Sequence, residues 1–348
     1  MSVKIIPATE FLTAQYDGIP IIDVRSPSEF KQGHIPGAFN IPLFNDEERA
    51  VIGTIYKKEG RDQAISKGLE ITGPKMKQLY QTALKEFEGH SDLIIHCWRG
   101  GMRSASMAWL LSLTGKTCII IQGGYKTYRQ HILENLNCQR YNFVILGGRT
   151  GCHKTSILRE MKRQGENVID LEELADHKGS AFGWIGRTSE SGTEQFENDL
   201  YSELSKFNAN KKIWLENESR TIGKIQIPEG IWKLMREAPL IHLDVDDTWR
   251  IENLVNTYYD NNPVQLIESF EKIRKRLGHE QTDEAIKHIQ SGNYDKAVAI
   301  ALNYYDKTYD YGLSRRQEEK VHRLRLQKNT LEIITQQIIE FKNKIIKE

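Results

Sequence analysis

Apolar residues in the first half of the chain come in short runs that end at polar or glycine-containing turns. Runs of this length, bounded by turn residues, predict buried strands at 20–24, 93–95 and 117–121. Residues 103–114 carry apolar side chains at helical spacing, and Gly115 predicts the end of that helix. Strands that alternate with helices predict an α/β domain over residues 1–138.

The same alternation returns after Cys138 and then gives way to helices. Apolar runs predict further strands at 141–146, 213–215 and 240–243. From about Thr248 the spacing becomes helical, and the clearest predicted helices are 263–277, capped by Asn262, and 331–346. We therefore expect a second α/β domain over residues 139–348, with a helical and basic C-terminal part.

Composition changes this picture little. The chain has 348 residues, of which 39% are hydrophobic, so it is long enough for about two domains with buried cores. The sequence has no apolar run of membrane-spanning length and no signal-peptide pattern, so we expect a cytoplasmic protein that does not bind membranes. The four cysteines show no C-x-x-C spacing, so neither metal ligands nor a disulfide framework is expected. With a net charge of +1, any nucleic-acid binding depends on local basic patches.

Cys97 follows a predicted strand and lies in a glycine-containing turn that leads into a helix. The backbone N–H groups of such a turn, together with the helix dipole, can hold a tetrahedral anion against the sulfur. An inert core cysteine is the commoner case, but two glycines and two arginines in the next six positions favour a reactive thiolate. We expect Cys97 and Arg103 to be catalytic. The loop between them, which we expect to bind the anion, comprises Trp98, Arg99, Gly100, Gly101 and Met102.

A second candidate site follows the predicted strand 141–146. The segment 147–156 has the glycine, lysine and threonine spacing of a P-loop, between a strand and a helix. His153 stands where the pattern has glycine, and its side chain could obstruct the approach of backbone to phosphate. We expect phosphate binding, without NTP hydrolysis, at Gly148, Arg149, Thr150, Gly151, Lys154 and Thr155.

Three other stretches carry candidate chemistry. The strand 213–215 ends at the sheet edge where α/β proteins bind ligands, and we expect Glu216, Ser219 and Arg220 there to position a substrate. Basic and aromatic residues interleave over 304–325, which suits a nucleic-acid surface and equally a solvated helix face. The charge-rich insertion around 56–62 is either a functional loop or a solvated helix pair.

Several motifs in the first 135 residues or so resemble a rhodanese domain. They are 23–25, 29–30, 33–38 and the Cys97 loop. Five residues separate Cys97 from Arg103, and this spacing also fits the cysteine-phosphatase pattern, in which the arginine binds a phosphate through two hydrogen bonds. The loop alone therefore leaves open both phosphate hydrolysis and the transfer of sulfur or selenium.

Over nearly its full length the chain resembles the tRNA 2-selenouridine synthase family. The motifs that carry this resemblance are 56–62, 97–104, 177–183, 196–198 and 216–223. The resemblance implies that selenium from selenophosphate replaces the sulfur of 2-thiouridine at the tRNA wobble position. It also implies an S-geranyl-2-thiouridine intermediate, which is made from geranyl diphosphate.

The resemblance further implies roles for the candidate residues. Cys97 would carry selenium as a perselenide, while Arg103 and the loop hold selenophosphate. Lys154, Thr155 and the rest of the P-loop would hold the diphosphate of geranyl diphosphate, and Arg220 would help to position the tRNA. The expected partners are a tRNA with 2-thiouridine at the wobble position and an enzyme that supplies selenophosphate. We expect no tightly bound cofactor, although Mg²⁺ could accompany the diphosphate.

Two alternatives use the same features differently. A rhodanese-fold phosphatase or sulfurtransferase would use the Cys97 loop without any RNA, but it leaves the second domain unexplained. A non-enzymatic nucleotide-binding or tRNA-binding protein with a vestigial rhodanese domain would lose no activity when Cys97 is removed.

Overall fold

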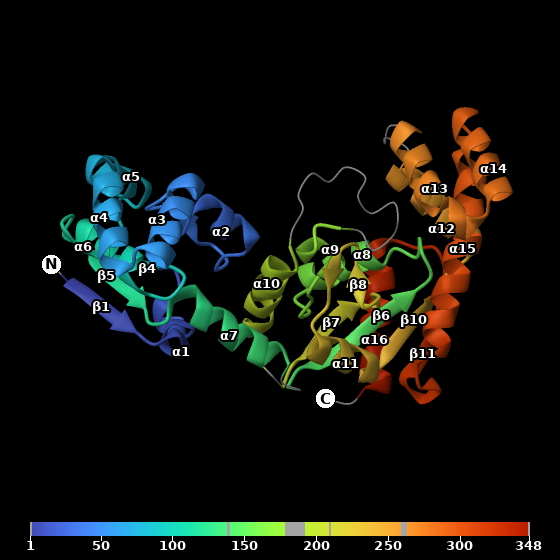
Figure 1. The fold of residues 1–348 in the computed structure, drawn as a ribbon. Helices are drawn as coiled ribbons and strands as arrows, with labels where there is room; N and C mark the ends of the chain where they lie inside the picture. The colour runs from blue at the N-terminus through green and yellow to red at the C-terminus, as the bar shows by residue number, and fades with distance from the viewer. Residues whose placement is uncertain (1, 138–139, 178–191, 209, 259–262, 347–348) are drawn as a thin grey trace. The chain divides into compact units, whose positions relative to one another are not determined.

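The computed structural model of the protein describes residues 2–137, 140–177, 192–208, 210–258 and 263–346 (Figure 1). The chain forms two compact units. The first comprises Met1–Leu136 and Glu197–Ser202, and the second comprises Asn137–Phe196 and Glu203–Glu348. Within the described ranges, no helix is both long and apolar enough to cross a membrane.

The first unit is built on a five-stranded parallel sheet. Its strands lie in the order β1-β5-β4-β2-β3. They span Ser2–Ile6 (β1), Ile21–Asp23 (β2), Phe39–Asn40 (β3), Asp92–His96 (β4) and Thr117–Ile121 (β5). The apolar runs that predicted strands form β2, β4 and β5, because their side chains are buried in a sheet covered by helices. The predicted α/β fold is confirmed for this unit.

Seven α-helices of the first unit are described, and they surround this sheet (Figure 1). They span Ala8–Phe11 (α1), Pro27–Gln32 (α2), Asp46–Lys58 (α3), Arg61–Thr72 (α4), Met76–Glu86 (α5), Met102–Ser112 (α6) and Gly124–Leu136 (α7). Leu79 of α5 and Met107 of α6 pack in one apolar core with Ile95 of β4. The insertion around residues 56–62 is therefore helical, since it joins α3 to α4.

The second unit has a four-stranded parallel sheet in the order β11-β10-β6-β7. The strands span Asn142–Gly148 (β6), Lys212–Glu216 (β7), Leu240–Asp244 (β10) and Val321–Arg325 (β11), and a small antiparallel hairpin joins Thr221–Ile222 (β8) to Ile225–Gln226 (β9). Helices α8 (Lys154–Arg163) and α16 (Leu331–Ile345) share an apolar core with this sheet. The other helices of the α/β part are α9 (Leu171–Leu174) and α11 (Glu229–Glu237), and α10 (Thr193–Ser205) contributes residues to both units, with Glu197–Ser202 in the first.

The C-terminal part is mostly helical, as predicted, with one correction. Four of the described α-helices lie between β10 and β11 in the chain: α12 (Asp247–Tyr258), α13 (Pro263–Leu277), α14 (His279–Gln290) and α15 (Tyr294–Ser314). Residues 321–325, which the sequence analysis included in the helical extension, instead form β11 and pair in parallel with β10. Leu324 then packs against the apolar core, which a short polar-apolar alternation in a strand allows. The expected cap Asn262 lies outside the described residues.

Two glycines hold the loop after β4 against the turn after β5. Gly100 has φ +62° and Gly124 has φ +59°, a backbone conformation that favours glycine. A Cβ atom on Gly124 would lie 2.3 Å from the carbonyl oxygen of Cys97 and 2.4 Å from the amide nitrogen of Gly100. The N–H of Tyr125 also donates a hydrogen bond to the Cys97 carbonyl at 2.9 Å. The position of the cysteine loop therefore depends on this close backbone contact.

We predict that Gly124→Ala destabilises the protein by about 2 kcal/mol or more, because it adds a backbone clash to the cost of a positive φ. Gly89→Ala is the matched control, since Gly89 also has a positive φ (+83°) but has no atom within 4 Å of the added Cβ. Urea unfolding measures both variants. Equal destabilisation by the two substitutions would show that the contact between the loops contributes nothing.

Candidate functional site

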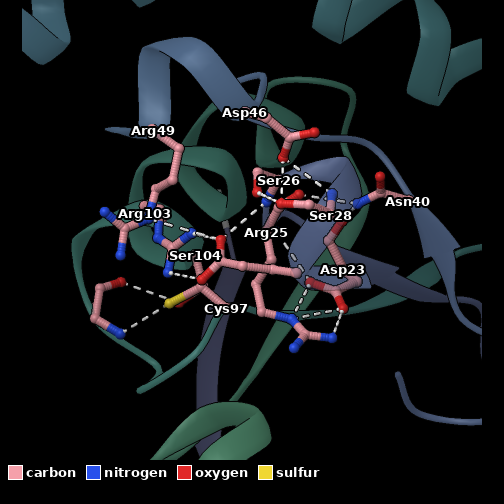
Figure 2. Close-up of polar contacts among 12 residues, drawn as sticks. Asp23, Arg25, Ser26, Ser28, Asn40, Asp46, Arg49, Cys97, Arg103 and Ser104 are labelled. Atoms are coloured by element: carbon pink, nitrogen blue, oxygen red, sulfur yellow. Dashed lines mark hydrogen bonds and ion pairs between the residues drawn. The ribbon is translucent and has the colours of Figure 1, made fainter. Parts of the chain in front are cut away.

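Cys97 lies at the start of the loop that joins β4 to α6. The Gly101 N–H donates a hydrogen bond to its Sγ at 3.3 Å, and the Ser104 Oγ lies 3.3 Å from the same sulfur (Figure 2). The residue is 3% exposed, yet it borders a cavity of about 900 Å³. Predicted loop residues that line this cavity are Trp98, Arg99, Gly101, Met102 and Arg103. Gly100 instead faces the turn after β5.

The surroundings of Cys97 favour its thiolate. Burial raises the pKa of the thiol, but hydrogen bonds from the Ser104 hydroxyl and from backbone N–H groups, with the charge of Arg103, lower the pKa by more. Its pKa therefore lies below the ordinary value. Burial raises the pKa of Cys118 to about 11 and also raises the pKa of Cys152. Among these three described cysteines, the structure therefore prepares Cys97 for nucleophilic chemistry.

Arg103 is already paired with Glu29, a residue of the rhodanese-like motif 29–30 that was not predicted to lie in the site. Its Nη1 donates to Glu29 Oε2 at 2.7 Å, and its Nη2 donates to Glu29 Oε1 at 3.3 Å. Burial raises the pKa of Glu29, but the hydrogen bonds and charge of Arg103 outweigh this and lower the pKa. An anion that enters the cavity must therefore share the Arg103 guanidinium with Glu29.

A buried ion pair fixes the turn that carries Glu29. The Arg25 guanidinium donates to Asp23 Oδ2 at 2.5 Å (Figure 2). It also donates to the Gly33 carbonyl at 2.7 Å, and both charged side chains are almost fully buried. At the first turn of α2, the backbone N–H of Ser26 donates to Glu29 Oε2 at 3.0 Å. The Glu29 carboxylate therefore caps α2 and binds Arg103 at the same time. The Asp-Val-Arg motif at 23–25 has a structural role in positioning this carboxylate.

The second site lies where β6 runs into α8. A cavity of about 330 Å³ is lined by the predicted residues Gly148, Thr150, Gly151, Lys154 and Thr155. The Lys154 Nζ donates to the Gly148 carbonyl at 3.1 Å and lies 3.5 Å from Glu216 Oε1. Burial lowers the pKa of Lys154, but Cys152, Glu216 and other neighbouring groups raise it by more, so the amine stays charged. These features suit the binding of phosphate groups.

His153 adopts the left-handed conformation that a glycine would have at this position, with φ 63° and ψ 16°. Its ring packs against Trp249, and the ring centroids are 4.9 Å apart. The histidine therefore keeps the backbone conformation of the P-loop, and Trp249 holds its side chain.

Three predicted site residues do not line the P-loop cavity. Arg149 donates to Asp310 Oδ2 at 2.7 Å and borders a different cavity. Ser219 donates a hydrogen bond to the Thr221 carbonyl, and Arg220 donates to Glu229 Oε2 at 2.5 Å. Of the candidates after β7, only Glu216 lines the cavity, because it ends the strand next to the P-loop strand.

Three glutamates gather beside the P-loop lysine, although the sequence analysis predicted no metal ligands. Carboxylate oxygens of Glu172, Glu216 and Glu218 all lie within 4.8 Å of one another and line the P-loop cavity. The Glu216 side chain is 4% exposed, and its Oε2 has no hydrogen-bond partner within the described structure. Burial and mutual repulsion raise the pKa of Glu172 to about 9 and that of Glu218 to about 8. Oxygen ligands in this arrangement suit a divalent cation such as Mg²⁺.

Much of the aromatic and basic tract at 304–325 has internal contacts. The Gly148 N–H donates to the Tyr309 hydroxyl at 2.7 Å, and Asp306 pairs with Arg250 at 2.5 Å. Arg316 is buried and donates to the Met235 carbonyl at 2.9 Å. Tyr309 and Asp306 support the P-loop from α15, whereas Arg316 holds the end of α11, and none of the three can also form an open nucleic-acid surface. Exposed basic residues that could do so lie on α13, namely Lys272, Lys275 and Arg276.

Comparisons with known proteins match both units. A family model described as a tRNA 2-selenouridine synthase AAA domain matches residues 141–339, and one described as a rhodanese-like domain matches residues 8–131. The chain is similar to the tRNA 2-selenouridine synthase of Hydrogenovibrio crunogenus, with 32% identity over 86% of this chain and 90% of that protein. It is similar to the tRNA 2-selenouridine synthase of Marinobacter nauticus, with 33% identity over 89% of this chain and 92% of that protein.

Solved structures give shorter matches. An N-terminal domain from Clostridium difficile 630 is 38% identical, with a TM-score of 0.35, over 37% of this chain and 99% of that domain. A rhodanese-like domain protein from Staphylococcus aureus is 23% identical, with a TM-score of 0.23, over 36% of this chain and 90% of that protein.

We predict that Ser104→Ala raises the pKa of the Cys97 thiol by about one unit, because the thiolate loses a hydroxyl donor. The pH dependence of iodoacetamide alkylation, followed by mass spectrometry of the peptide that contains Cys97, measures this pKa. Ser106→Ala is the control, since Ser106 lies exposed on the same helix. An unchanged alkylation midpoint in Ser104→Ala would show that the hydroxyl does not stabilise the thiolate.

Proposed function

Because this chain belongs to the tRNA 2-selenouridine synthase family, we propose that it replaces the sulfur of wobble 2-thiouridine in tRNA with selenium from selenophosphate. The observation that carries this proposal is the Cys97 thiol, whose pKa is lowered at the edge of a cavity with cationic side chains. Selenophosphate is a tetrahedral anion, which such a loop can bind.

In this proposal Cys97 is the residue that takes up selenium. Arg103 and the loop N–H groups hold the phosphate part of selenophosphate, and the thiolate attacks selenium, so that the S–Se bond forms as the Se–P bond breaks and its electron pair leaves with phosphorus as phosphite. The perselenide selenium then attacks C2 of the base and displaces geranyl thiol. A thiol supplied in the medium reduces the S–Se bond, forms a disulfide with Cys97, and leaves selenium on C2. Glu29 would compete with the anion for Arg103. When no anion is bound, the same carboxylate holds the guanidinium in place.

The second unit would prepare the base for this exchange. A thiolate on C2 is a poor leaving group, whereas a geranylated sulfur leaves as a neutral thiol. We place the diphosphate of geranyl diphosphate in the P-loop cavity, on Lys154, Thr155 and the loop N–H groups. No nucleotide hydrolysis is needed for this step, since the bond that breaks joins the allylic carbon to the diphosphate.

A divalent cation would let the carboxyl groups of this cavity ionise beside a diphosphate. The raised pKa values of Glu172 and Glu218, about 9 and about 8, keep these groups protonated near neutral pH, whereas their ionised forms would repel a polyanion unless a cation is bound. The unpaired and buried Oε2 of Glu216 fits a Mg²⁺ ligand. When bound, Mg²⁺ would neutralise charge on the departing diphosphate. These three glutamates, with the Thr155 hydroxyl 3.5 Å from Glu172, would hold it.

Exposed Lys272, Lys275 and Arg276 on α13 would contact tRNA phosphates, and half-exposed Arg220 would help if it exchanged Glu229 for a phosphate. Because selenophosphate is a reactive anion, a separate enzyme would supply it.

We predict that Cys97→Ala lowers selenation of 2-thiouridine tRNA by roughly a thousandfold or more, because no nucleophile remains to take up selenium. The protein is incubated with this tRNA, geranyl diphosphate and selenophosphate, and nucleosides are measured by mass spectrometry. S-geranyl-2-thiouridine should still form.

The control for this experiment is Cys118→Ala, which removes a buried cysteine of β5 whose pKa is raised. This variant should keep selenation. Selenation that survives Cys97→Ala would refute the perselenide role. Release of phosphate from an aryl phosphate without tRNA would instead support the phosphatase alternative.

We predict that Glu216→Gln weakens binding of Mn²⁺, used as a probe for Mg²⁺, by about tenfold or more, because the cation loses a charged and buried ligand. Electron paramagnetic resonance of free Mn²⁺ measures the affinity. Glu173→Gln is the control, since Glu173 borders the same cavity outside the cluster of three glutamates. Equal affinities for the two variants would exclude the cluster as the cation site.

A further inference from the structure

The first unit contains an apolar cavity that neither the cysteine chemistry nor the P-loop uses. Its volume is about 690 Å³, within the range of roughly 300–1,000 Å³ that is typical of small-molecule sites. Four helices contribute to its wall. Representative lining residues are Ile52 of α3, Ile65 and Leu69 of α4, Met76 of α5, and Met107 and Trp109 of α6.

This apolar cavity adjoins the Cys97 cavity. Five residues border both, namely Phe44, Ile52, Tyr56, Met102 and Arg103. Met102 and Arg103 belong to the first turn of α6, directly after the cysteine loop. An apolar group that enters here therefore lies beside the anion that Arg103 contacts.

The rim of the apolar cavity exposes large apolar side chains to solvent. Leu69 is 68% exposed, Tyr56 is 59% exposed, and Met102 and Trp109 are each 50% exposed. Exposed apolar side chains gathered around one cavity mark a place where an apolar ligand, a protein or a membrane makes contact, and the cavity favours a ligand. The insertion that separates the rhodanese-like motifs provides two of these residues, Tyr56 and Leu69.

We propose that this cavity binds the geranyl group of S-geranyl-2-thiouridine tRNA while selenium replaces the sulfur. This inference rests on the proposed function and adds a substrate site to it. The geranyl group is attached to the sulfur that leaves C2, so it must lie within a few bonds of the selenium on Cys97. The apolar cavity begins at that place, and a branched ten-carbon hydrocarbon matches its lining.

A geranyl group bound in this cavity would have two roles. The isoprenoid makes the sulfur a better leaving group, and it also anchors the modified base next to the perselenide. An RNA whose C2 sulfur carries only a small alkyl group has the same leaving-group chemistry but lacks this anchor. If the cavity binds the geranyl group, the enzyme should prefer tRNAs with longer S-alkyl groups. If alkylation has only a chemical role, the length of the S-alkyl group should not matter.

The experiment compares tRNAs that carry S-methyl, S-prenyl or S-geranyl 2-thiouridine, each supplied as the starting material together with selenophosphate. The unaltered protein should convert the S-geranyl tRNA with a kcat/KM at least about tenfold above that for S-methyl tRNA. Leu69→Glu should remove most of this preference by raising KM for S-geranyl tRNA, with little effect on S-methyl tRNA. Trp109→Glu, which changes a rim residue of α6, should likewise raise KM for S-geranyl tRNA.

Leu113→Glu is the matched control, because Leu113 is 47% exposed near the end of α6 and does not border the cavity. It should retain the chain-length preference. Equal kcat/KM values for the three tRNAs, or equal losses on all of them in Leu69→Glu and Trp109→Glu, would overturn the geranyl site. If this face instead binds a protein or a second copy of the chain, Leu69→Glu and Trp109→Glu should keep the chain-length preference, and that result would also overturn the geranyl site. If the unaltered protein converts none of the alkylated tRNAs, the proposed function fails instead.

Discussion

The ion pair between Glu29 and Arg103 is the interaction on which the cysteine site depends. Its two hydrogen bonds, at 2.7 and 3.3 Å, fix the guanidinium whose charge favours the Cys97 thiolate. Glu29 is itself held by the first turn of α2, and the buried pair of Asp23 and Arg25 fixes the turn before that helix. Breaking such a buried pair leaves an uncompensated charge, so residues far from the cysteine in sequence help to hold Arg103. The hydrogen bonds from Ser104 and the loop N–H groups lower the pKa of Cys97 by more than the charge of Arg103 does.

The P-loop cavity of the second unit is rich in carboxyl groups, in contrast to the Cys97 cavity, which is lined by Arg99 and Arg103. In the second unit an anion-binding loop faces three carboxylates, and a single charged lysine lies between them at 3.5 Å from Glu216. Without a cation the carboxylates hold protons more tightly, as the raised pKa values of Glu172 and Glu218 show. One unit therefore surrounds its candidate site with hydrogen-bond donors and guanidinium charge, and the other surrounds its candidate site with carboxyl groups that a cation would allow to ionise.

The sequence predicted what depends on local pattern. Apolar runs located β4, β5, β6, β7 and β10, because buried parallel strands are continuous hydrophobic stretches. It missed β11, whose arginines resemble a helix end, and it missed the pairing of Glu29 with Arg103 and the gathering of Glu172 with Glu216. These contacts join segments that are distant in sequence, and no local spacing encodes them. Arg149 followed the loop motif but turns to Asp310, since a carboxylate on α15 attracts it.

His153 adopts a left-handed backbone conformation at the P-loop position where the pattern has glycine. A left-handed backbone costs a side-chain-bearing residue roughly 1–2 kcal/mol, which glycine avoids. The contact of its ring with Trp249 of α12 compensates for part of that cost and holds the loop in a way that glycine cannot. The backbone is therefore more rigid, so that a phosphate bound by its amides would cost less entropy of ordering.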